Sequence, residues 1–182
     1  MNNKLYVLRH CKTFFNERNI VSGQMDCPLT DSFIDYSILN NGNSCKPYIL
    51  ICSPLSRSIL TGKMLQTQSK LQMSTFTDSR ILERNMGIFE GKKRSQLVKE
   101  YPDYFINGHF IYYMTPPGGE SYQKFKYRVL SFASFIEGML LECNVVICSH
   151  NQTLRMLTAI MSRKKYEDIP KFPNGIMKEI LL

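Results

Sequence analysis

Short apolar runs that end abruptly in polar residues form the most regular pattern along this chain. Runs at Leu5–Leu8, Tyr48–Cys52 and Asn144–Ser149 have the length and composition of strands buried on both faces of a sheet. A further strand is predicted at Thr75–Leu82. The final segment, Gly175–Leu182, is predicted to be a strand at an edge of the sheet.

Between these strands, apolar residues recur at helical spacing. The predicted helices are Ser32–Leu39, Leu55–Gln68, Ser95–Tyr101, Glu120–Glu142 and Thr153–Ser162. A polar loop, Thr13–Thr30, precedes the first helix, with Thr30 or Asp31 as its cap, and a turn is predicted over residues 40–44. The alternation predicts an α/β fold, a three-layer α/β/α sandwich with a mostly parallel central sheet and an antiparallel edge strand.

The chain has 182 residues, of which 43% are hydrophobic, and this suits one domain over residues 1–182. No stretch approaches the roughly 18 continuous apolar residues of a membrane helix, and the amino terminus lacks the layout of a secretory signal. None of the six cysteines forms a C-x-x-C pair, so neither a zinc site nor a redox pair is indicated. We therefore expect a reducing, cytoplasmic location.

The net charge of +8 allows two interpretations. A basic protein can bind nucleic acid, a membrane or another polyanion, or it can focus its potential into a pocket for a small phosphorylated molecule. The basic residues are scattered, apart from Lys92–Arg94 and Arg163–Lys165, and such short clusters are typical of solvated faces. We therefore expect no nucleic-acid or membrane partner, and a homodimer is a possible assembly.

Cationic and imidazole side chains follow three of the predicted strands. Arg9 and His10 follow the first, Arg57 follows the second after a short turn, and His150 follows the fourth. Ligands bind outside the carboxyl ends of parallel strands, so these side chains are expected to converge on one anion-sized pocket. The residues alone leave open which histidine is the nucleophile.

Six blocks carry a resemblance to a known family. They are Arg9-His10 with Thr13 and Asn16; Gly23 with Asp26 and Pro28–Thr30; Ser53–Arg57 with Thr61; Leu82–Gly91; Gly118–Ser121; and Ser149-His150. In this order they resemble the histidine phosphatase superfamily, which has the phosphoglycerate mutase-like fold, and the chain is most similar to its compact phosphatase members. The resemblance implies a metal-independent phosphomonoester hydrolase that needs no cofactor and acts on a small phosphorylated metabolite.

The resemblance makes His10 the nucleophile, which would form a phosphohistidine, and makes His150 a group that stabilises the phosphoryl oxygens. Arg9, Arg57 and Asn16 would bind the same oxygens, and the planar fork of an arginine suits them. A nucleophilic imidazole needs its second ring nitrogen to be held, and a backbone carbonyl would do this.

Glu83 is the predicted proton donor. A leaving alkoxide needs a proton and the attacking water must then lose one, so a single carboxyl group can serve both steps. Glu90 is the rival by position, but the resemblance favours Glu83, because the family's donor is the first glutamate of this block. Glu90 is then expected to be structural, and Glu120 is expected to cap the long helix or to bind a loop backbone.

Four residues are candidates for substrate specificity: Ser22, Gly23, Arg84 and Arg94. The family's mutases resemble this chain at Arg84 and at Arg94, positions that would face a substrate carboxylate. The aromatic segment Tyr104–Tyr113 fits either a lid or wall for a flat or apolar leaving group, or simple packing over the core.

Three positions depart from the family pattern. Cys11 stands where glycine is usual, Lys12 where an acidic or amide residue is common, and Ser22 where glutamine is frequent. Cys11 bears on the tightness of the first loop and Lys12 adds charge near the mouth of the pocket. None of the three removes a reacting group.

Other functions fit the sequence less well. Phosphoglycerate mutase-type transfer is the main alternative, but the segment Asn107–Tyr113 lacks the arginine pair that the mutases carry. An inactive phosphate-binding module is the next, and the complete set of reacting residues speaks against it. Cys52 and Arg57 are separated by four residues, one fewer than the loop of a cysteine phosphatase requires.

Overall fold

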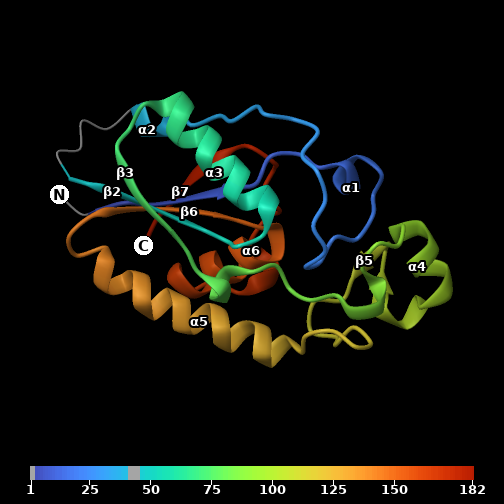
Figure 1. Ribbon diagram of the computed structural model, residues 1–182. Coiled ribbons are helices and arrows are strands. Elements are labelled where there is room, and N and C mark those ends of the chain that lie inside the picture. Colours follow the sequence, from blue (N-terminus) through green and yellow to red (C-terminus); the bar gives the residue numbers. More distant parts are fainter. Residues whose placement is uncertain (1–2, 41–45) are drawn as a thin grey trace.

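A five-stranded sheet runs through the middle of the molecule in the computed structural model, which describes residues 3–40 and 46–182 (Figure 1). The strands lie in the order β3-β2-β6-β1-β7. Their bounds are β1 Leu5–Arg9, β2 Tyr48–Cys52, β3 Met73–Thr77, β6 Asn144–Ser149 and β7 Met177–Ile180. The turn predicted over residues 40–44 falls outside the described residues, apart from Asn40.

The pairing of the strands confirms a mostly parallel sheet with an antiparallel edge. Leu5 of β1 pairs with Val145 of β6 in the parallel direction and with Ile180 of β7 in the antiparallel direction. Strand β2 lies between β6 and β3 and is parallel to both. The carboxyl ends of β1, β2 and β6 therefore meet at one edge, where the residues that follow them come together.

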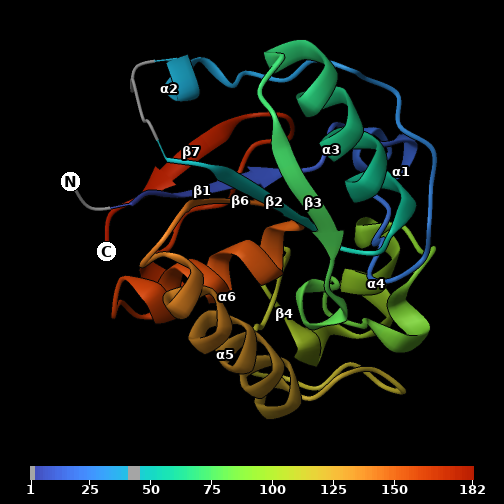
Figure 2. The same cartoon turned by 60° about the vertical axis from the view of Figure 1, so that its left-hand side comes forward.

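Helices cover both faces of this sheet (Figures 1 and 2). They are α2 Ser37–Asn40 and α3 Ser56–Ser69 on one face, and α5 Tyr122–Met139 and α6 Asn151–Met161 on the other. Alternate residues of β1 point to opposite faces of the sheet. Tyr6 packs in the core beneath α3, and Val7 packs in the core beneath α5 and α6. The three-layer α/β/α sandwich is thereby confirmed.

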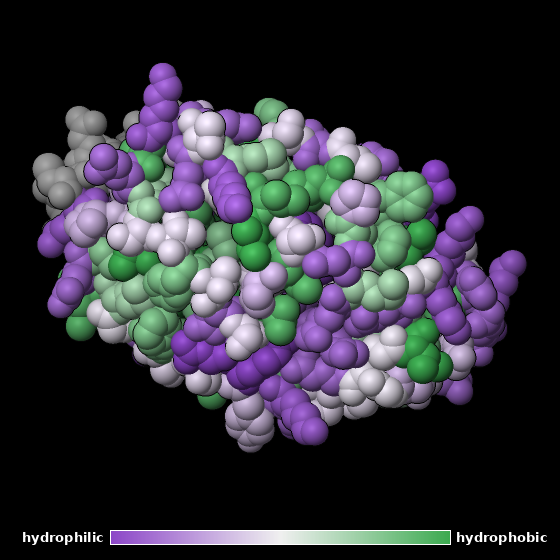
Figure 3. Space-filling view, viewed as in Figure 1, coloured by the Kyte–Doolittle hydropathy of each residue, from purple (hydrophilic) through white to green (hydrophobic). Residues whose placement is uncertain are grey.

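Between β3 and α5 the chain leaves the sheet and forms a peripheral unit, residues 82–121, beyond the carboxyl edge (Figure 1). It contains η2 Gly87–Phe89, α4 Arg94–Glu100, η3 Pro102–Tyr104, β4 Phe105–Ile106 and β5 His109–Phe110. Phe89 fills its centre, with the ring centroids of Tyr101 and Tyr104 at 5.1 and 5.4 Å. Hydrophilic side chains gather over this end of the molecule (Figure 3).

The predicted helix Ser32–Leu39 is wrong, because only its end is helical, as α2. The Asp31 carboxylate accepts a hydrogen bond from the Phe33 N–H, and the Asp35 carboxylate accepts one from the Ser37 N–H. These local bonds offer the backbone an alternative to a helix.

The helix cap predicted at Thr30 or Asp31 is therefore wrong as well. A helix that was not predicted, α1 Phe14–Glu17, lies inside the polar loop instead. Thr13 caps it, since its hydroxyl accepts a hydrogen bond from the Asn16 N–H at 3.3 Å.

The predicted strand Thr75–Leu82 is wrong at both ends. Strand β3 begins two residues earlier and stops at Thr77, because Asp78 caps the 3-10 helix η1, Ser79–Ile81. The other elements lie close to their predicted positions. Within the described residues, no helix is long and apolar enough to span a membrane.

Candidate active site

A pocket of about 390 Å³ opens at the carboxyl edge of the sheet. Its inner end, next to the sheet, is lined by three of the predicted phosphate-binding residues, Arg9, Asn16 and Arg57, together with His10 and Glu83. Its outer end lies against the peripheral unit. A volume of this size is that of a small-molecule site.

His10 stands at the end of β1 and is held by backbone groups on both sides. Its N–H donates to the Ser149 carbonyl at 3.0 Å, and its ring Nδ1 lies 2.7 Å from the carbonyl oxygen of Cys11. A carbonyl only accepts, so Nδ1 carries the proton and Nε2 keeps a free lone pair. Burial, together with the charges of Arg9 and Arg57, holds the pKa of His10 well below its ordinary value. The ring is thus neutral at neutral pH, and its Nε2 keeps the lone pair that the predicted nucleophile needs.

Arg9 is anchored at one nitrogen and free at another. Its Nη1 donates to the Phe172 carbonyl at 2.9 Å, while its buried Nε has no partner among the described residues. Burial lowers the pKa of this guanidinium. A buried cationic donor without an acceptor is costly, and Arg9 is also one of the residues that line the pocket.

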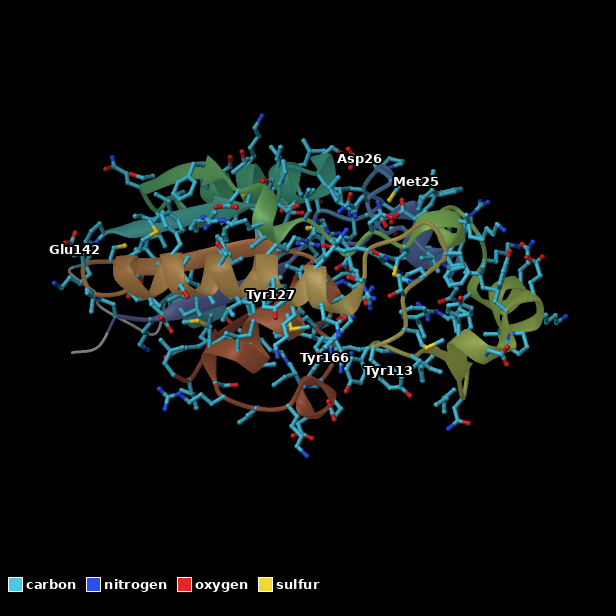
Figure 4. All side chains as sticks on the ribbon, turned by 90° about the horizontal axis from the view of Figure 1, so that it is seen from below. Met25, Asp26, Tyr113, Tyr127, Glu142 and Tyr166 are labelled. Carbon is cyan, nitrogen blue, oxygen red and sulfur yellow. The ribbon has the colours of Figure 1, made fainter. Side chains whose placement is uncertain are left out.

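Arg57 is the second residue of α3, and its guanidinium donates to two carbonyl groups and to the imidazole of His150. Its Nη1 donates to Met25 O at 2.7 Å and its Nη2 to Gly23 O at 2.8 Å. Asp26 lies 3.5 Å away as an ion-pair partner. Figure 4 shows Met25 and Asp26, the partners of Arg57 in this loop, on the side of the molecule opposite to Tyr113 and Tyr166. Arg57 therefore holds the loop of residues 23–26 in place as well as facing the pocket.

His150 lies directly behind the pocket rather than on its wall. Its ring centroid is 5.2 Å from that of His10, and Arg57 Nε donates to its Nδ1 at 3.3 Å. The proton must then be on Nε2, which lies 2.7 Å from the hydroxyl oxygen of Ser53. Burial and the charges of its neighbours hold the pKa of His150 well below its ordinary value, so this ring is also neutral. To reach a phosphoryl oxygen, its Nε2–H must exchange Ser53 for the ligand.

Asn16 is oriented by a residue that the sequence did not reveal. Its Oδ1 accepts from the Thr13 N–H at 3.2 Å and from Asn174 Nδ2 at 3.1 Å, so its own amide N–H₂ is left for the pocket. Asn174 also donates to the carbonyl of His10 at 2.9 Å. One side chain near the carboxyl end thus positions both the nucleophile and a neutral donor.

Glu83 lies on the pocket wall, against the amino terminus of α6. Its Oε1 accepts from the backbone N–H of Thr153 at 3.2 Å and from the Thr153 hydroxyl at 3.1 Å. Its Oε2 accepts from the Gln152 N–H at 3.2 Å. These bonds fix the orientation of the carboxyl group, which lines the same pocket as His10.

Glu90 has the structural role that was expected. Its carboxylate accepts hydrogen bonds from the N–H groups of Gln24, Met25 and Met86. A Cβ on Gly23, which has a φ of +50°, would lie 2.0 Å from this carboxylate, so a glycine is required there.

Glu120 does not cap α5, because Ser121 does. It binds Arg128 at 2.7 Å instead, and its Oε2 lies 3.4 Å from the backbone N–H of Asn85. The second alternative for this residue, binding of a loop backbone, is the one that the structure shows.

The two candidate arginines of the peripheral unit point in different directions. Arg84 is fully buried, does not line the pocket, and donates to the carbonyls of Tyr112, Met114 and Glu120, so the structure does not bring it together with the other predicted site residues. Because the side chain is fully buried away from the pocket, these carbonyl groups are the partners that its guanidinium meets. Arg94 does line the pocket.

The three residues that depart from the family pattern, Cys11, Lys12 and Ser22, are accommodated in the loops around the pocket. Cys11 is buried, and its N–H donates to the Thr61 hydroxyl at 2.9 Å. Lys12 is exposed, lies 3.8 Å from Glu17 and does not line the pocket. Ser22 and Gly23 both line it.

The aromatic segment serves both of its predicted uses. Phe105, Phe110 and Tyr112 line the pocket, and the same Phe110 packs against Phe89 in the core of the peripheral unit, with ring centroids 6.2 Å apart. One layer of rings is thus both core and wall.

Other residues, which the sequence did not reveal, also line the outer end of the pocket. Arg155 comes from α6, His109 from β5, and Lys171 from the segment before β7. A helical pattern could have placed Arg155 on the pocket side of α6, one turn beyond Asn151. Nothing in the sequence around Lys171 or His109 indicates that they meet.

Comparison with known proteins gives one family. The model of the "Histidine phosphatase superfamily (branch 1)" matches residues 5–177. The chain is 28% identical over 162 residues to "Putative phosphoserine phosphatase 2" of Hydrogenobacter thermophilus, covering 87% of this chain and 78% of that one. It is 27% identical over 197 residues to the 2,3-bisphosphoglycerate-dependent phosphoglycerate mutase of Chlamydia caviae, covering 91% and 86%.

A solved structure shares the fold. The mycobacterial glucosyl-3-phosphoglycerate phosphatase in complex with VO3 is 19% identical, with a TM-score of 0.78 and coverage of 97% of this chain and 90% of that one. At this identity the likeness describes the fold alone.

Proposed function

The chain belongs to the histidine phosphatase superfamily, and from this premise we propose that it hydrolyses small phosphomonoesters through a phosphohistidine on His10. The observation that carries the proposal is the 2.7 Å contact between His10 Nδ1 and the Cys11 carbonyl. It leaves the lone pair on Nε2 of a histidine that lines the same pocket as Arg9, Asn16 and Arg57.

In the first step, His10 Nε2 attacks phosphorus in line with the ester oxygen. A P–N bond forms as the P–O bond breaks, and the leaving alkoxide takes a proton from the Glu83 carboxyl group. In the second step, water attacks phosphorus on the phosphohistidine and gives its proton to the Glu83 carboxylate. The P–N bond breaks, inorganic phosphate leaves, and His10 and Glu83 return to their starting forms.

Charge stabilisation comes from preorganised donors around the equatorial oxygens. Arg9 and Arg57 supply two permanent positive charges, and the free amide N–H₂ of Asn16 supplies a neutral donor. His150 would add its Nε2–H after releasing Ser53. The protein's own cations thus fill the role that a metal ion has in other phosphatases, so the reaction is expected to need none.

Mutase activity is the second candidate, because some of the relatives are phosphoglycerate mutases. A mutase must keep water from the phosphohistidine and transfer the group to an isomeric product. The segment 107–113 carries no arginine, and we favour hydrolysis for that reason. Quantification of free phosphate against isomerised ester from the same reaction separates the two.

The test is partitioning of the intermediate. With a series of aryl and alkyl phosphates and a fixed amount of a simple alcohol, a common phosphohistidine must give one ratio of phosphorylated alcohol to inorganic phosphate, whatever the leaving group. A ratio that changes with the leaving group, or activity lost to a chelator and restored by magnesium, would contradict the mechanism.

The location and assembly of the protein are part of the proposal. Cys11, Cys27, Cys52, Cys143 and Cys148 are buried free thiols, which suits a reducing cytoplasm. Recovery of the native protein in a secreted or membrane fraction would contradict this. A homodimer remains an open alternative to a monomer, and light scattering on the purified chain decides between them.

A further inference from the structure

Arg128 of α5 does not line the active-site pocket, yet its guanidinium makes five hydrogen bonds within the protein. Its Nη1 donates to the carbonyls of Arg80 and Leu82, each at 2.8 Å. Its Nη2 donates to the carbonyl of Glu83 at 3.1 Å. An arginine has five N–H groups, and three of those of Arg128 thus bind the segment that contains the predicted proton donor.

The other two N–H groups of Arg128 bind the Glu120 carboxylate. Nε donates to Oε1 at 2.7 Å and Nη2 donates to Oε2 at 2.8 Å, which is the bidentate geometry of a strong arginine–carboxylate pair. Only 19% of the Arg128 side chain and 14% of the Glu120 side chain are exposed. A pair that is mostly buried is screened less than one at the surface, so the two side chains hold a defined arrangement.

The Arg128–Glu120 pair closes the neck of the peripheral unit. That unit, residues 82–121, leaves the sheet after η1 and returns at the start of α5 (Figure 1). Arg128 bonds the outgoing chain at residues 80–83 and the returning chain at Glu120. The place of Glu83 in this neck therefore depends on the pair.

Glu83 is held at two places by different groups. Its carboxyl group is bonded to the first turn of α6, through Gln152 and Thr153. Its main-chain carbonyl accepts from Arg128 and, at 2.9 Å, from Gln24 Nε2. A proton donor must lie within hydrogen-bond distance of the leaving oxygen, so its action depends on the main chain that carries it as well as on the carboxyl group.

We infer that Arg128 is a positioning residue for catalysis, which joins the main chain of residues 80–83 to Glu120 and thereby places the Glu83 carboxyl group within reach of the leaving oxygen. The inference rests on the proposed function, in which Glu83 protonates that oxygen. Arg128 itself touches neither the substrate nor the reacting atoms, because it lies outside the pocket. Its effect is therefore concentrated in the part of the reaction that needs the proton.

The leaving group distinguishes positioning of Glu83 from simple support of the fold. In each variant, kcat/KM is measured for an alkyl phosphate, whose leaving group needs the proton, and for dinitrophenyl phosphate, whose leaving group does not. Both values report formation of the phosphohistidine, so the ratio of alkyl to aryl kcat/KM cancels the amount of folded enzyme. We expect Arg128→Met to lower this ratio on the order of 10²-fold, the effect of moving a catalytic group by about 1 Å.

Three further variants locate the effect. Glu120→Gln keeps the shape of the partner without its charge, and Arg128→Lys keeps the charge without the planar fork. Both should give ratios between those of the native enzyme and Arg128→Met, and they carry the same test where Arg128→Met does not fold. In a Glu83→Gln background, Arg128→Met should lower the ratio no further, because the group that it positions is already removed.

Arg80→Met is the matched control. Arg80 also forms an ion pair, with Asp78 at 2.6 Å, and its side chain also bonds to α5, at the Ser131 carbonyl at 3.2 Å. Among the described residues its side chain makes no hydrogen bond to Glu83, and it does not line the pocket. Its replacement should leave the ratio unchanged.

A ratio that falls in Glu83→Gln but not in Arg128→Met would overturn the inference and leave the proposed function intact. Equal losses for the two esters in Arg128→Met would also overturn it, because support of the fold acts on both. The same holds if the ratio falls as far in Arg80→Met. A ratio that Glu83→Gln itself leaves unchanged would reject Glu83 as the donor, and the inference would then fail together with that part of the proposed function.

Discussion

At the inner end of the pocket His10 and Arg57 are fixed by backbone carbonyls, whereas at the outer end Arg94 and Lys171 meet few protein partners. His10 is fixed by the carbonyl of Cys11, and Arg57 by those of Gly23 and Met25. Arg94 has no such partner among the described residues, and Lys171 has only His109. The inner end is thus built for one geometry around phosphorus, and the outer end is left open for a ligand to complete.

Among the changes that distinguish the inner from the outer end of the pocket, replacement of Glu83 is expected to have the largest effect on the rate of hydrolysis. Glu83→Gln should slow hydrolysis of alkyl phosphates by about 10²–10⁴-fold, because these poor leaving groups need the proton. Phosphorylation by activated aryl phosphates should be nearly unaffected, and pre-steady-state bursts measure that step. Equal losses for both kinds of ester would show that Glu83 is not the acid.

Next in size is the loss of Arg9. Arg9→Met should lower kcat/KM by about 10²–10³-fold, because a preorganised cationic donor to the phosphoryl oxygens is removed.

Arg84→Met is the matched comparison, since it removes a buried arginine that does not line the pocket. It should destabilise the fold by about 3 kcal/mol through the buried carbonyls left without a donor, measured by urea unfolding. A substrate preference altered in Arg84→Met at full folding would contradict the assignment of this residue to the structure alone.

A smaller effect is expected at Asn174, which acts through its neighbours. Asn174→Ala should reduce kcat about tenfold, the value of one or two lost hydrogen bonds, and should weaken inhibition by inorganic phosphate. If it acts by orienting Asn16, its effect on phosphate inhibition should largely disappear in an Asn16→Ala background.

The control for this experiment is Asn3→Ala, which removes an amide-to-carbonyl bond of 2.8 Å to Leu140, outside the pocket. It should leave phosphate inhibition unchanged. Fully additive effects of Asn174→Ala and Asn16→Ala would show that Asn174 does not act by positioning Asn16.

Mildly acidic pH is expected to have the smallest effect on the rate of phosphorylation. The pKa of His10 is held well below its ordinary value of 6.5 by burial and by two arginines, so the ring is still neutral at that pH. Phosphorylation by an activated aryl phosphate, corrected for ionisation of the ester, should stay level down to pH 6.5. It should then fall about tenfold per pH unit only below the lowered pKa, because the protonated ring has no lone pair. A decline centred at 6.5 would contradict this.

The inner end was predictable because parallel strands bring their carboxyl ends together by geometry alone. Arg9, His10 and His150 follow apolar runs that could only be buried strands, and the bounds of β2 and β6 were predicted to the residue. The order of blocks then favoured His10 over His150 as the nucleophile, a choice that the local sequence could not make.

The rest depended on contacts between distant segments. Asn174 meets His10 and Asn16 across more than 150 residues of chain, and no local pattern marks it. The structure does not bring Arg84 into the pocket, because position in a motif does not reveal which way a side chain points. The helix predicted at Ser32–Leu39 failed because the Asp31 and Asp35 side chains bind their own backbone.

The central claim is a covalent phosphohistidine on His10, and rapid quenching with a phosphate-labelled substrate tests it most directly. The native enzyme should retain label that is lost in acid and survives alkali, as a P–N bond requires. His10→Ala should retain none, while His150→Ala should form the same adduct more slowly. Label retained in His10→Ala and absent from His150→Ala would contradict the account.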